Sequence, residues 1–325
     1  MRFKPSYCLD VLNEESYHRE MQNIAHILDK YKVSGYMESF DRNKIYYEYY
    51  LAENPKASVV IVHGFKEFAK KYTEICWYFL QMGYNVFLYD QRGHGFSHRE
   101  NDLIHVVHIN EFSDYTKDLD VLIQKIVQPN SSDVPIYLYG HSMGGAVAMF
   151  YITQANSAAL KTVLAAPMIY PECISLPRQV LRALIKRRAK KVGWDTGSKI
   201  TEDFDPEQCY AQSIELSDCR FNYTQSLRMN EPKYQHVCSS NRWNYEALGL
   251  IKTLLSKKKI AEVKSEVLMI TAGQDVVVKR KPQKIYAKRM GCAYKCFKTA
   301  KHSLHAQKTE ELFEYLNAVF AFYEQ

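Results

Sequence analysis

A run of apolar residues, a glycine-rich turn and a second apolar run follow one another near the middle of this 325-residue chain. The first run is Ile136 to Tyr139, the turn is Gly140-His141-Ser142-Met143-Gly144-Gly145, and the second run begins at Ala146. This pattern predicts a buried strand that turns sharply into a helix, with Ser142 in a strained backbone at the tip of the turn. The positive end of that helix would face a developing anion. The turn therefore requires a fold in which a sheet strand leads directly into a helix, and it makes Ser142 a candidate nucleophile.

The rest of the chain repeats the alternation of strand and helix. Strands are expected at 33–40, 44–51, 58–62, 84–89, 136–139, 162–166, 267–271 and 293–299, and helices at 69–82, 111–127 and 143–153. The first two strands read as a hairpin, whereas 58–62 is a continuous β-branched run, typical of a strand covered on both faces. The alternation predicts an α/β fold, a mostly parallel central sheet flanked by helices.

The alternation stops between residues 168 and 245, where the sequence becomes polar, aromatic and irregular, with no strand of the buried type. We interpret this interval as an inserted cap, or lid, that packs on the sheet. The predicted organisation is an N-terminal helical extension (1–32), an α/β core (33–167 and 246–325) and a cap (168–245).

Composition indicates a globular protein, because 46% of the residues are hydrophobic and 13% are aromatic. The eight cysteines show no Cys-x-x-Cys pair, so we expect free, mostly buried thiols in a reducing compartment. Acidic residues interrupt the first thirty positions, and no stretch approaches the roughly 20 apolar residues of a membrane-spanning helix. We therefore expect a cytoplasmic protein, with peripheral membrane contact as an additional possibility.

A serine hydroxyl needs a base, and the base needs an acid that holds its tautomer. At strand–helix turns of this kind the chain order is serine, acid, histidine. Asp275 follows the expected strand 267–271, and His302 follows 293–299, so both belong to the same edge of the sheet as Ser142. His305 competes with His302, which we prefer because it lies closer to the strand end. An ordinary turn aspartate is the alternative for Asp275.

The negative charge that develops on a substrate oxygen would be held by backbone amides. One belongs to Met143, directly after the serine, and the other to Phe65, in the loop after the strand 58–62. This chemistry requires no metal and no organic cofactor.

With these residues placed, the chain resembles the α/β-hydrolase superfamily, in particular its branch of monoacylglycerol lipases and bacterial lysophospholipases. The resemblance rests on His63-Gly64-Phe65-Lys66-Glu67 with Lys71-Tyr72, on Asp90-Gln91-Arg92-Gly93-His94-Gly95-Phe96-Ser97, on Gly140 to Gly145, on Ala166-Pro167-Met168 and on Gly273-Gln274-Asp275. Carried over by position, it implies the same triad and the same two amides. Phe68, where many members have a histidine, and Ser239 to Arg242, which replace a glycine-rich segment, depart from the pattern at the substrate pocket.

The resemblance implies a serine hydrolase that cleaves carboxylic esters of acyl lipids, a monoacylglycerol or a lysophospholipid, through an acyl-enzyme. A general carboxylesterase or a serine peptidase of the same fold are alternatives, because fold and triad do not select the substrate. A non-catalytic binding protein on this scaffold would be expected to lack a member of the triad.

The net charge of +7 has a local origin. Seven cations and no acid lie between residues 178 and 191, and without them 43 − 7 = 36 basic residues balance 36 acidic ones. The segment predicts a helix with Val180, Leu181, Leu184 and Ile185 on one face. We expect contact with an anionic membrane through Arg178, Arg182, Lys186, Arg187 and Arg188; the alternative is a solvated helix packed on the core. Nucleic acid is not an expected partner, because no nucleic-acid-binding motif accompanies the segment. Nothing in the sequence indicates an oligomeric state.

Overall fold

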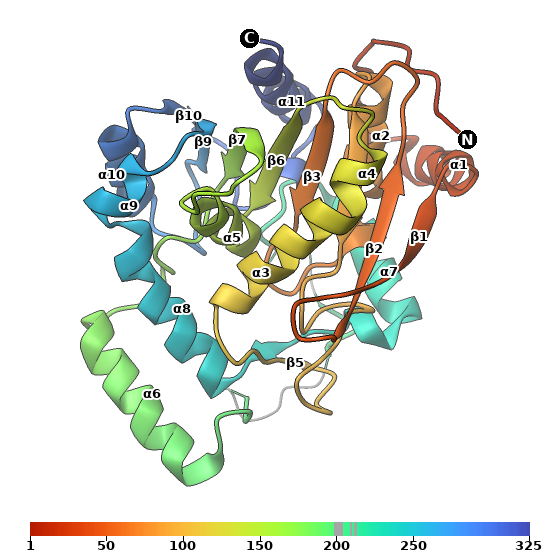
Figure 1. Ribbon diagram of the computed structural model, residues 1–325. Helices are drawn as coiled ribbons and strands as arrows, with labels where there is room; N and C mark the ends of the chain where they lie inside the picture. The colour runs from red at the N-terminus through yellow and green to blue at the C-terminus, as the bar shows by residue number, and fades with distance from the viewer. Residues whose placement is uncertain (198–203, 209, 211–212) are drawn as a thin grey trace.

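The computed structural model describes residues 1–197, 204–208, 210 and 213–325. A sheet of eight strands forms its centre (Figure 1). In spatial order the strands are β1 (Val33–Glu38), β2 (Lys44–Tyr50), β4 (Asn85–Tyr89), β3 (Ser58–Val62), β6 (Ile136–His141), β7 (Ala159–Ala165), β9 (Glu266–Ala272) and β10 (Ala293–Phe297). The β1–β2 and β2–β4 pairs are antiparallel, and all the other pairs are parallel. The predicted mostly parallel sheet with an N-terminal hairpin is confirmed.

Helices cover both faces of this sheet (Figure 1). One face packs against α1 (Tyr17–Asp29), α2 (Thr73–Gln81) and α11 (Thr309–Glu324), and the other against α3 (Ser113–Leu122), α5 (Met143–Tyr151), α8 (Asn241–Leu254) and α10 (Arg280–Met290). Shorter helical segments are η1 (Ala69–Tyr72), η2 (Ile123–Val127), α4 (Gln128–Asn130), α9 (Lys257–Ala261) and η5 (Leu304–Ala306). No helix in the described part of the chain is both long and apolar enough to cross a membrane.

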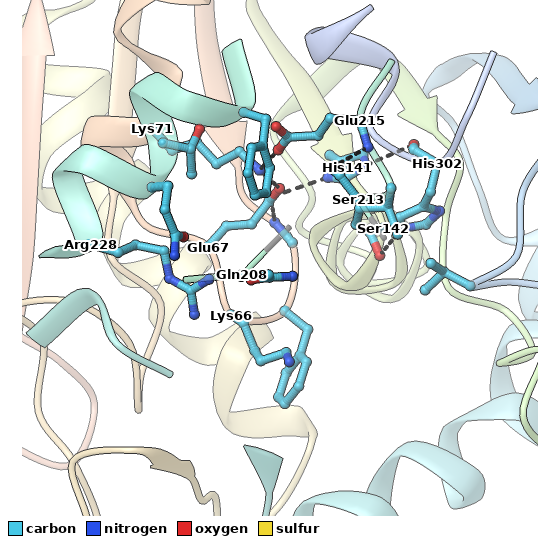
Figure 2. A pocket seen from close by; sticks show the side chains of 17 residues that line it. Lys66, Glu67, Lys71, His141, Ser142, Gln208, Ser213, Glu215, Arg228 and His302 are labelled. Atoms are coloured by element: carbon cyan, nitrogen blue, oxygen red, sulfur yellow. Dashed lines mark hydrogen bonds and ion pairs between the residues drawn. The ribbon is translucent and has the colours of Figure 1, made fainter. Parts of the chain in front are cut away.

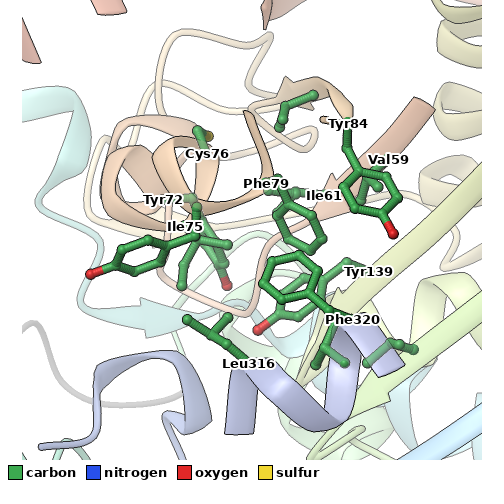
Figure 3. Packing of buried hydrophobic residues seen from close by; sticks show 14 of the residues in the cluster. Val59, Ile61, Tyr72, Ile75, Cys76, Phe79, Tyr84, Tyr139, Leu316 and Phe320 are labelled. Atoms are coloured by element: carbon green, nitrogen blue, oxygen red, sulfur yellow. The ribbon is translucent and has the colours of Figure 1, made fainter. Parts of the chain in front are cut away.

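The central strand β3 shows why its sequence lacks polar alternation. Val59 and Ile61 belong to the apolar cluster on one face of the sheet, whereas Val60 and Val62 belong to the cluster on the other. Figure 3 shows the first cluster, in which Val59 and Ile61 pack near Phe79 of α2 and residues of α11. Burial of each such side chain contributes about 1.5–3 kcal/mol. The core therefore holds the carboxyl ends of the parallel strands in fixed positions.

The insertion contains α6 (Arg178–Val192), α7 (Asp218–Asn230), η4 (Pro232–Tyr234) and β8 (Cys238–Ser239). The expectation that it lacks a buried strand is wrong, because the two buried residues of β8 pair in parallel with β5 (Val106–Val107) of the core. Helix α8 runs through the boundary predicted at residue 245, so that boundary falls inside a helix. The division into three parts stays a prediction.

The cysteines of the described residues form no disulfide. The expectation that most of them are buried is wrong: Cys76 and Cys238 are buried, Cys8 and Cys173 are exposed, and the other described ones are partly exposed. A cysteine can stay exposed when no second cysteine lies within reach to form a disulfide. The number and spacing of the cysteines therefore did not predict which of them are buried. Cys209 lies outside the described residues.

Candidate active site

Ser142 lies at the sharp turn between β6 and α5, with φ 53° and ψ −116°. Such a backbone is strained for a residue with a side chain, and it persists only where the surroundings enforce it. The surroundings are tight: a Cβ on Gly144 would lie 2.0 Å from the carbonyl oxygen of Val62 in β3. The end of β3 can therefore approach the first turn of α5 only because residue 144 is glycine.

His302 and Asp275 lie beside this serine, although both are far from it in sequence. The Nε2 atom of His302 is 2.8 Å from Ser142 Oγ, and its Nδ1 atom is 2.8 Å from Asp275 Oδ2. The other carboxylate oxygen of Asp275 accepts hydrogen bonds from the amides of Val277 and Val278. Asp275 follows β9 and His302 follows β10, so adjacent parallel strands bring the pair together.

The protonation states follow from the surroundings. Burial lowers the pKa of His302 below its ordinary value, and the hydrogen bond with Asp275 offsets only part of that effect. Burial alone would raise the pKa of Asp275, but His302 and the two amides outweigh it and hold this pKa below its usual range. The ionised carboxylate can only accept, so Nδ1 of the neutral imidazole carries the proton and Nε2 accepts from the serine hydroxyl.

His305, the competing histidine, does not reach Ser142. It stacks on the ring of Tyr72, and its Nε2 atom is 3.7 Å from Glu67 Oε1. Neither of its ring nitrogens makes a hydrogen bond with a described residue, and burial holds its pKa well below the ordinary value. Of the two candidates, His302 is the imidazole within hydrogen-bond distance of the serine.

Met143 directly follows the serine, Phe65 lines the same cavity as the serine, and neither backbone amide donates a hydrogen bond to another described residue. The loop that carries Phe65 is held by its neighbours: the Gly64 amide donates to Glu67 Oε2 at 2.6 Å, and the Lys66 amide donates to His94 Nε2 at 3.2 Å. Met143 is the first residue of α5, where amides have no partner within the helix. Both amides are thus available to an anionic oxygen.

A buried ionic network, which we did not predict as part of the site, adjoins the serine. The ammonium of Lys71 lies 3.0 Å from Glu67 Oε1 and 2.7 Å from Glu215 Oε1. Glu67 also accepts hydrogen bonds from Tyr72 and contacts His141. The two carboxylates raise the pKa of Lys71 despite its burial, so it stays charged. Glu67 and Lys71 stand in the loop motif, whereas Glu215 has no sequence signal.

Glu67, His141 and His305 offer ligand atoms within 4.8 Å of one another, close enough to test for a metal site. The Lys71 ammonium on Glu67 opposes a divalent cation, and the carboxylate is already occupied by donors from Gly64 and Tyr72. The chemistry of this group fits an ion-pair network better than a metal site.

Ser142 and His302 open onto a cavity of about 360 Å³ (Figure 2). The core contributes the loop of Phe65, Lys66 and Glu67 to its wall, and the insertion contributes Gln208, residues 213–215 and one side of α7. The wall is mixed: Ile214, Phe221 and Val277 supply apolar surface, and the network around Lys71 supplies charge. The cavity thus has room for a small ester next to the serine and a polar group farther away.

The cations of α6 are divided between the protein and its surface. The Arg182 guanidinium lies 3.9 Å from the ring centre of Tyr245, and Arg188 donates to Asn241 Oδ1 and to the carbonyl of Gly197. Arg178 is half-buried, and Lys186 and Arg187 are exposed. These contacts turn Arg182 and Arg188 away from any flat surface that α6 would touch.

The apolar residues of α6 are divided in the same way. Leu181 and Ile185 pack on a small cluster around Leu248, whereas 45% of Val180 and 51% of Leu184 are exposed. The sequence predicted one helix face for these four residues, and α6 packs only two of them on the protein. A spacing of three or four residues groups them on one side of a helix, but the width of the contact with α8 admits only two.

A strained serine between a strand and a helix, on a mostly parallel sheet with helices on both faces, defines an α/β-hydrolase. The chain belongs to the family described as Serine aminopeptidase, S33, whose sequence model matches residues 53–311.

Relatives and solved structures agree with this class. Phospholipase YtpA of Bacillus subtilis is 27% identical over 70% of this chain and 79% of its own length. Probable lysophospholipase L2 of Haemophilus influenzae is 26% identical over 69% of each chain. The fold is also similar to a soluble variant of monoglyceride lipase from Saccharomyces cerevisiae, in complex with a substrate analogue, with a TM-score of 0.68, 17% identity, and coverage of 89% of this chain and 94% of that one.

Proposed function

We propose that the protein hydrolyses carboxylic esters of acyl lipids, with Ser142 as nucleophile, His302 as general base and Asp275 as the acid that orients it. The observation that carries this proposal is the unbroken hydrogen-bond chain from Ser142 through His302 to Asp275. A neutral imidazole whose Nε2 atom faces the hydroxyl can take its proton as the serine attacks the ester carbonyl.

The remaining steps use the same groups. The amides of Phe65 and Met143 stabilise the tetrahedral oxyanion, and the imidazolium of His302 gives its proton to the departing alcohol. The acyl group is then bound to Ser142 as an ester. Water, deprotonated by the same imidazole, attacks this ester, and the fatty acid and the free serine are released.

The names of the relatives support a lipid ester as the substrate, because they include a phospholipase and a lysophospholipase. The family description names a peptidase, and carboxylesterases use the same chemistry. A panel of monoacylglycerols, lysophospholipids, short-chain esters and peptides separates these candidates. Preferred hydrolysis of the long-chain lipid esters is the expected result, and preferred release of N-terminal amino acids would favour the peptidase.

The test of the nucleophile is Ser142→Ala. We expect kcat on the best ester of the panel to fall by at least about 10⁴-fold, because the covalent step is lost. A serine-directed fluorophosphonate should label the parent protein and fail to label the variant. Ser113→Ala, at a surface serine outside the cavity, is the matched control. Full esterase activity in Ser142→Ala would overturn the proposal.

We further propose that α6 contacts an anionic membrane surface. Its exposed side carries Val180 and Leu184 next to Lys186 and Arg187, and Lys190 and Lys191 continue the exposed cations. Exposed apolar side chains surrounded by cations match an interface where acyl chains lie below anionic head groups. The inward contacts of Arg182 and Arg188 remove these two residues from the proposed membrane surface.

A further inference from the structure

Helix α7 presents a single cation to the catalytic cavity. Phe221, Thr224, Gln225 and Arg228 recur at helical spacing, and all four line the cavity. Figure 2 shows Arg228 and Ser142 at opposite sides of this cavity, with Glu67 and Gln208 between them. A substrate whose ester carbonyl lies at Ser142 and that fills the cavity would extend one end toward Arg228, and the charged guanidinium favours the polar alcohol portion over the acyl chain.

Backbone carbonyls, rather than a carboxylate, hold the guanidinium of Arg228 in place. Its Nε atom donates to the carbonyl of Tyr234 at 3.2 Å, and Nη2 donates to the carbonyl of His236 at 2.8 Å. Nη1 makes no hydrogen bond, and no carboxylate forms an ion pair with the guanidinium, among the residues that the structure describes. The carbonyl groups orient the side chain and leave its Nη1 donors unused by the described residues.

The two carboxylates of the cavity form their ion pairs with another cation. Glu67 and Glu215 both hold the ammonium of Lys71. Both carboxylates therefore lie in ion pairs with Lys71, and neither forms one with Arg228. Burial lowers the pKa of Arg228, and the more distant charge of Glu215 opposes this only in part.

A second cation of the wall is held by the same stretch of backbone. The Nζ atom of Lys66 donates to the carbonyl of Val237 at 2.9 Å, next to the carbonyl of His236 that binds Arg228. Adjacent carbonyls therefore hold two side chains of like charge near each other. A part-buried guanidinium that has no ion pair of its own is stabilised when a ligand brings negative charge.

We propose that Arg228 binds a phosphate group on the alcohol portion of the ester. This inference rests on the proposed ester hydrolysis and specifies its substrate. A guanidinium offers two parallel N–H donors to phosphate oxygens, and the unused Nη1 is one source of them. Arg228 would thus be a specificity-determining residue, and the preferred substrates would be acyl glycerophosphates rather than uncharged acylglycerols.

The test compares two esters with the same octanoyl chain, octanoylglycerol and octanoylglycerol 3-phosphate. We expect Arg228→Gln to lower kcat/KM for the phosphate ester by about 10- to 100-fold, the value of a charged hydrogen bond, and that for octanoylglycerol by less than about twofold. Arg228→Lys keeps the positive charge but not the two parallel N–H donors. Its kcat/KM for the phosphate ester should lie between that of the parent protein and that of Arg228→Gln. Arg242→Gln is the matched control, because that arginine stacks on Trp194 outside the cavity lining.

A binding measurement separates this inference from the proposed function. Titration calorimetry with glycerol 3-phosphate should show binding to the parent protein that Arg228→Gln abolishes, whether or not either ester is hydrolysed. Lack of hydrolysis of both esters would contradict the proposed function, whereas absence of this binding would overturn the role of Arg228. Equal loss of activity toward both esters in Arg228→Gln, or hydrolysis of octanoylglycerol alone by the parent protein, would also overturn it.

Discussion

The proposed catalytic role of Ser142 depends on a residue that does not hydrogen-bond to it. Asp275 holds His302 by Nδ1, and the amides of Val277 and Val278 hold Asp275. Rotation of the imidazole would leave a buried carboxylate without its donor, which is costly. The position of the imidazole beside the Ser142 hydroxyl therefore depends on Asp275, in the turn after β9.

Replacement of Asp275 by Asn tests this dependence. An amide can donate to Nδ1 and so favours the wrong tautomer. We expect kcat to fall by about 10⁴-fold, the effect that loss of the correct tautomer has in serine proteases.

In the parent protein kcat/KM should rise with pH to a plateau, with a midpoint below the ordinary histidine pKa of about 6.5, because His302 is active only when neutral.

Steady-state rates between pH 5 and 8.5 measure both effects. Asp102→Asn, at an exposed aspartate, is the control and should leave the profile unchanged. A midpoint above pH 7, or a loss below about tenfold in Asp275→Asn, would contradict this assignment of protonation states.

Among the elements, the junction of β6 and α5 shows the tightest packing near the site. A Cβ at residue 144 would meet two backbone oxygens of the β3 end, those of Val62 and His63, at 2.0 and 2.5 Å. Backbone cannot yield as a flexible side chain does, so the turn and the loop after β3 must separate if this glycine is replaced.

Gly144→Ala should lower the free energy of unfolding by about 3 kcal/mol or more, and activity should fall with it because the oxyanion loop is displaced. Gly291→Ala is the matched control: its φ of 69° is unfavourable for alanine, yet no atom lies within 4 Å of the added Cβ. The free energy of unfolding of that variant should fall by about 1 kcal/mol, and its activity should be unchanged. Urea unfolding measures the free energy of both variants. Equal losses would show that the close approach of residue 144 to the end of β3 is unimportant.

Helix α6 makes a separate prediction about membranes. Replacement of Lys186, Arg187, Lys190 and Lys191 by Gln should weaken binding to anionic vesicles by about 100-fold, at roughly 1 kcal/mol or less per cation, and leave hydrolysis of a soluble ester within about twofold. The control variant replaces four other exposed lysines by Gln and so changes the net charge by the same amount: Lys264, Lys281, Lys284 and Lys288. Cosedimentation with phosphatidylserine vesicles measures the difference, and equal loss in both variants would exclude a local contact.

At the scale of the whole molecule, the sequence predicted what strand order brings together. Ser142, Asp275 and His302 each follow a strand of one parallel sheet, so their meeting at one edge could be inferred from motif and chain order. The ion pair between Lys71 and Glu215 could not be inferred in this way. Glu215 belongs to the insertion, and no pattern in the sequence predicts where the insertion packs on the core. Arg228 likewise reads as an ordinary helical arginine until the cavity is known.

The same reasoning explains the half-covered apolar face of α6 and the unexpected strand β8. Helical periodicity finds an apolar face but not how much of it a neighbour covers, which here depends on α8. A strand of two residues is too short to show alternation, and β8 exists because β5 offers it a partner. Both outcomes were decided by tertiary contacts between segments far apart in the chain.

The wall that carries Arg228 is tied to the beginning of the chain. Arg220, also on α7, donates to both carboxylate oxygens of Glu74 in α2 and to the carbonyl of Leu12, and it lies over the ring of Tyr17. Truncation before β1 would remove two of these partners and leave the Arg220–Glu74 pair exposed to solvent. Residues outside the catalytic fold thus set the shape of the substrate cavity, and shortened or N-terminally fused versions of the enzyme would be expected to differ in selectivity before they differ in catalysis.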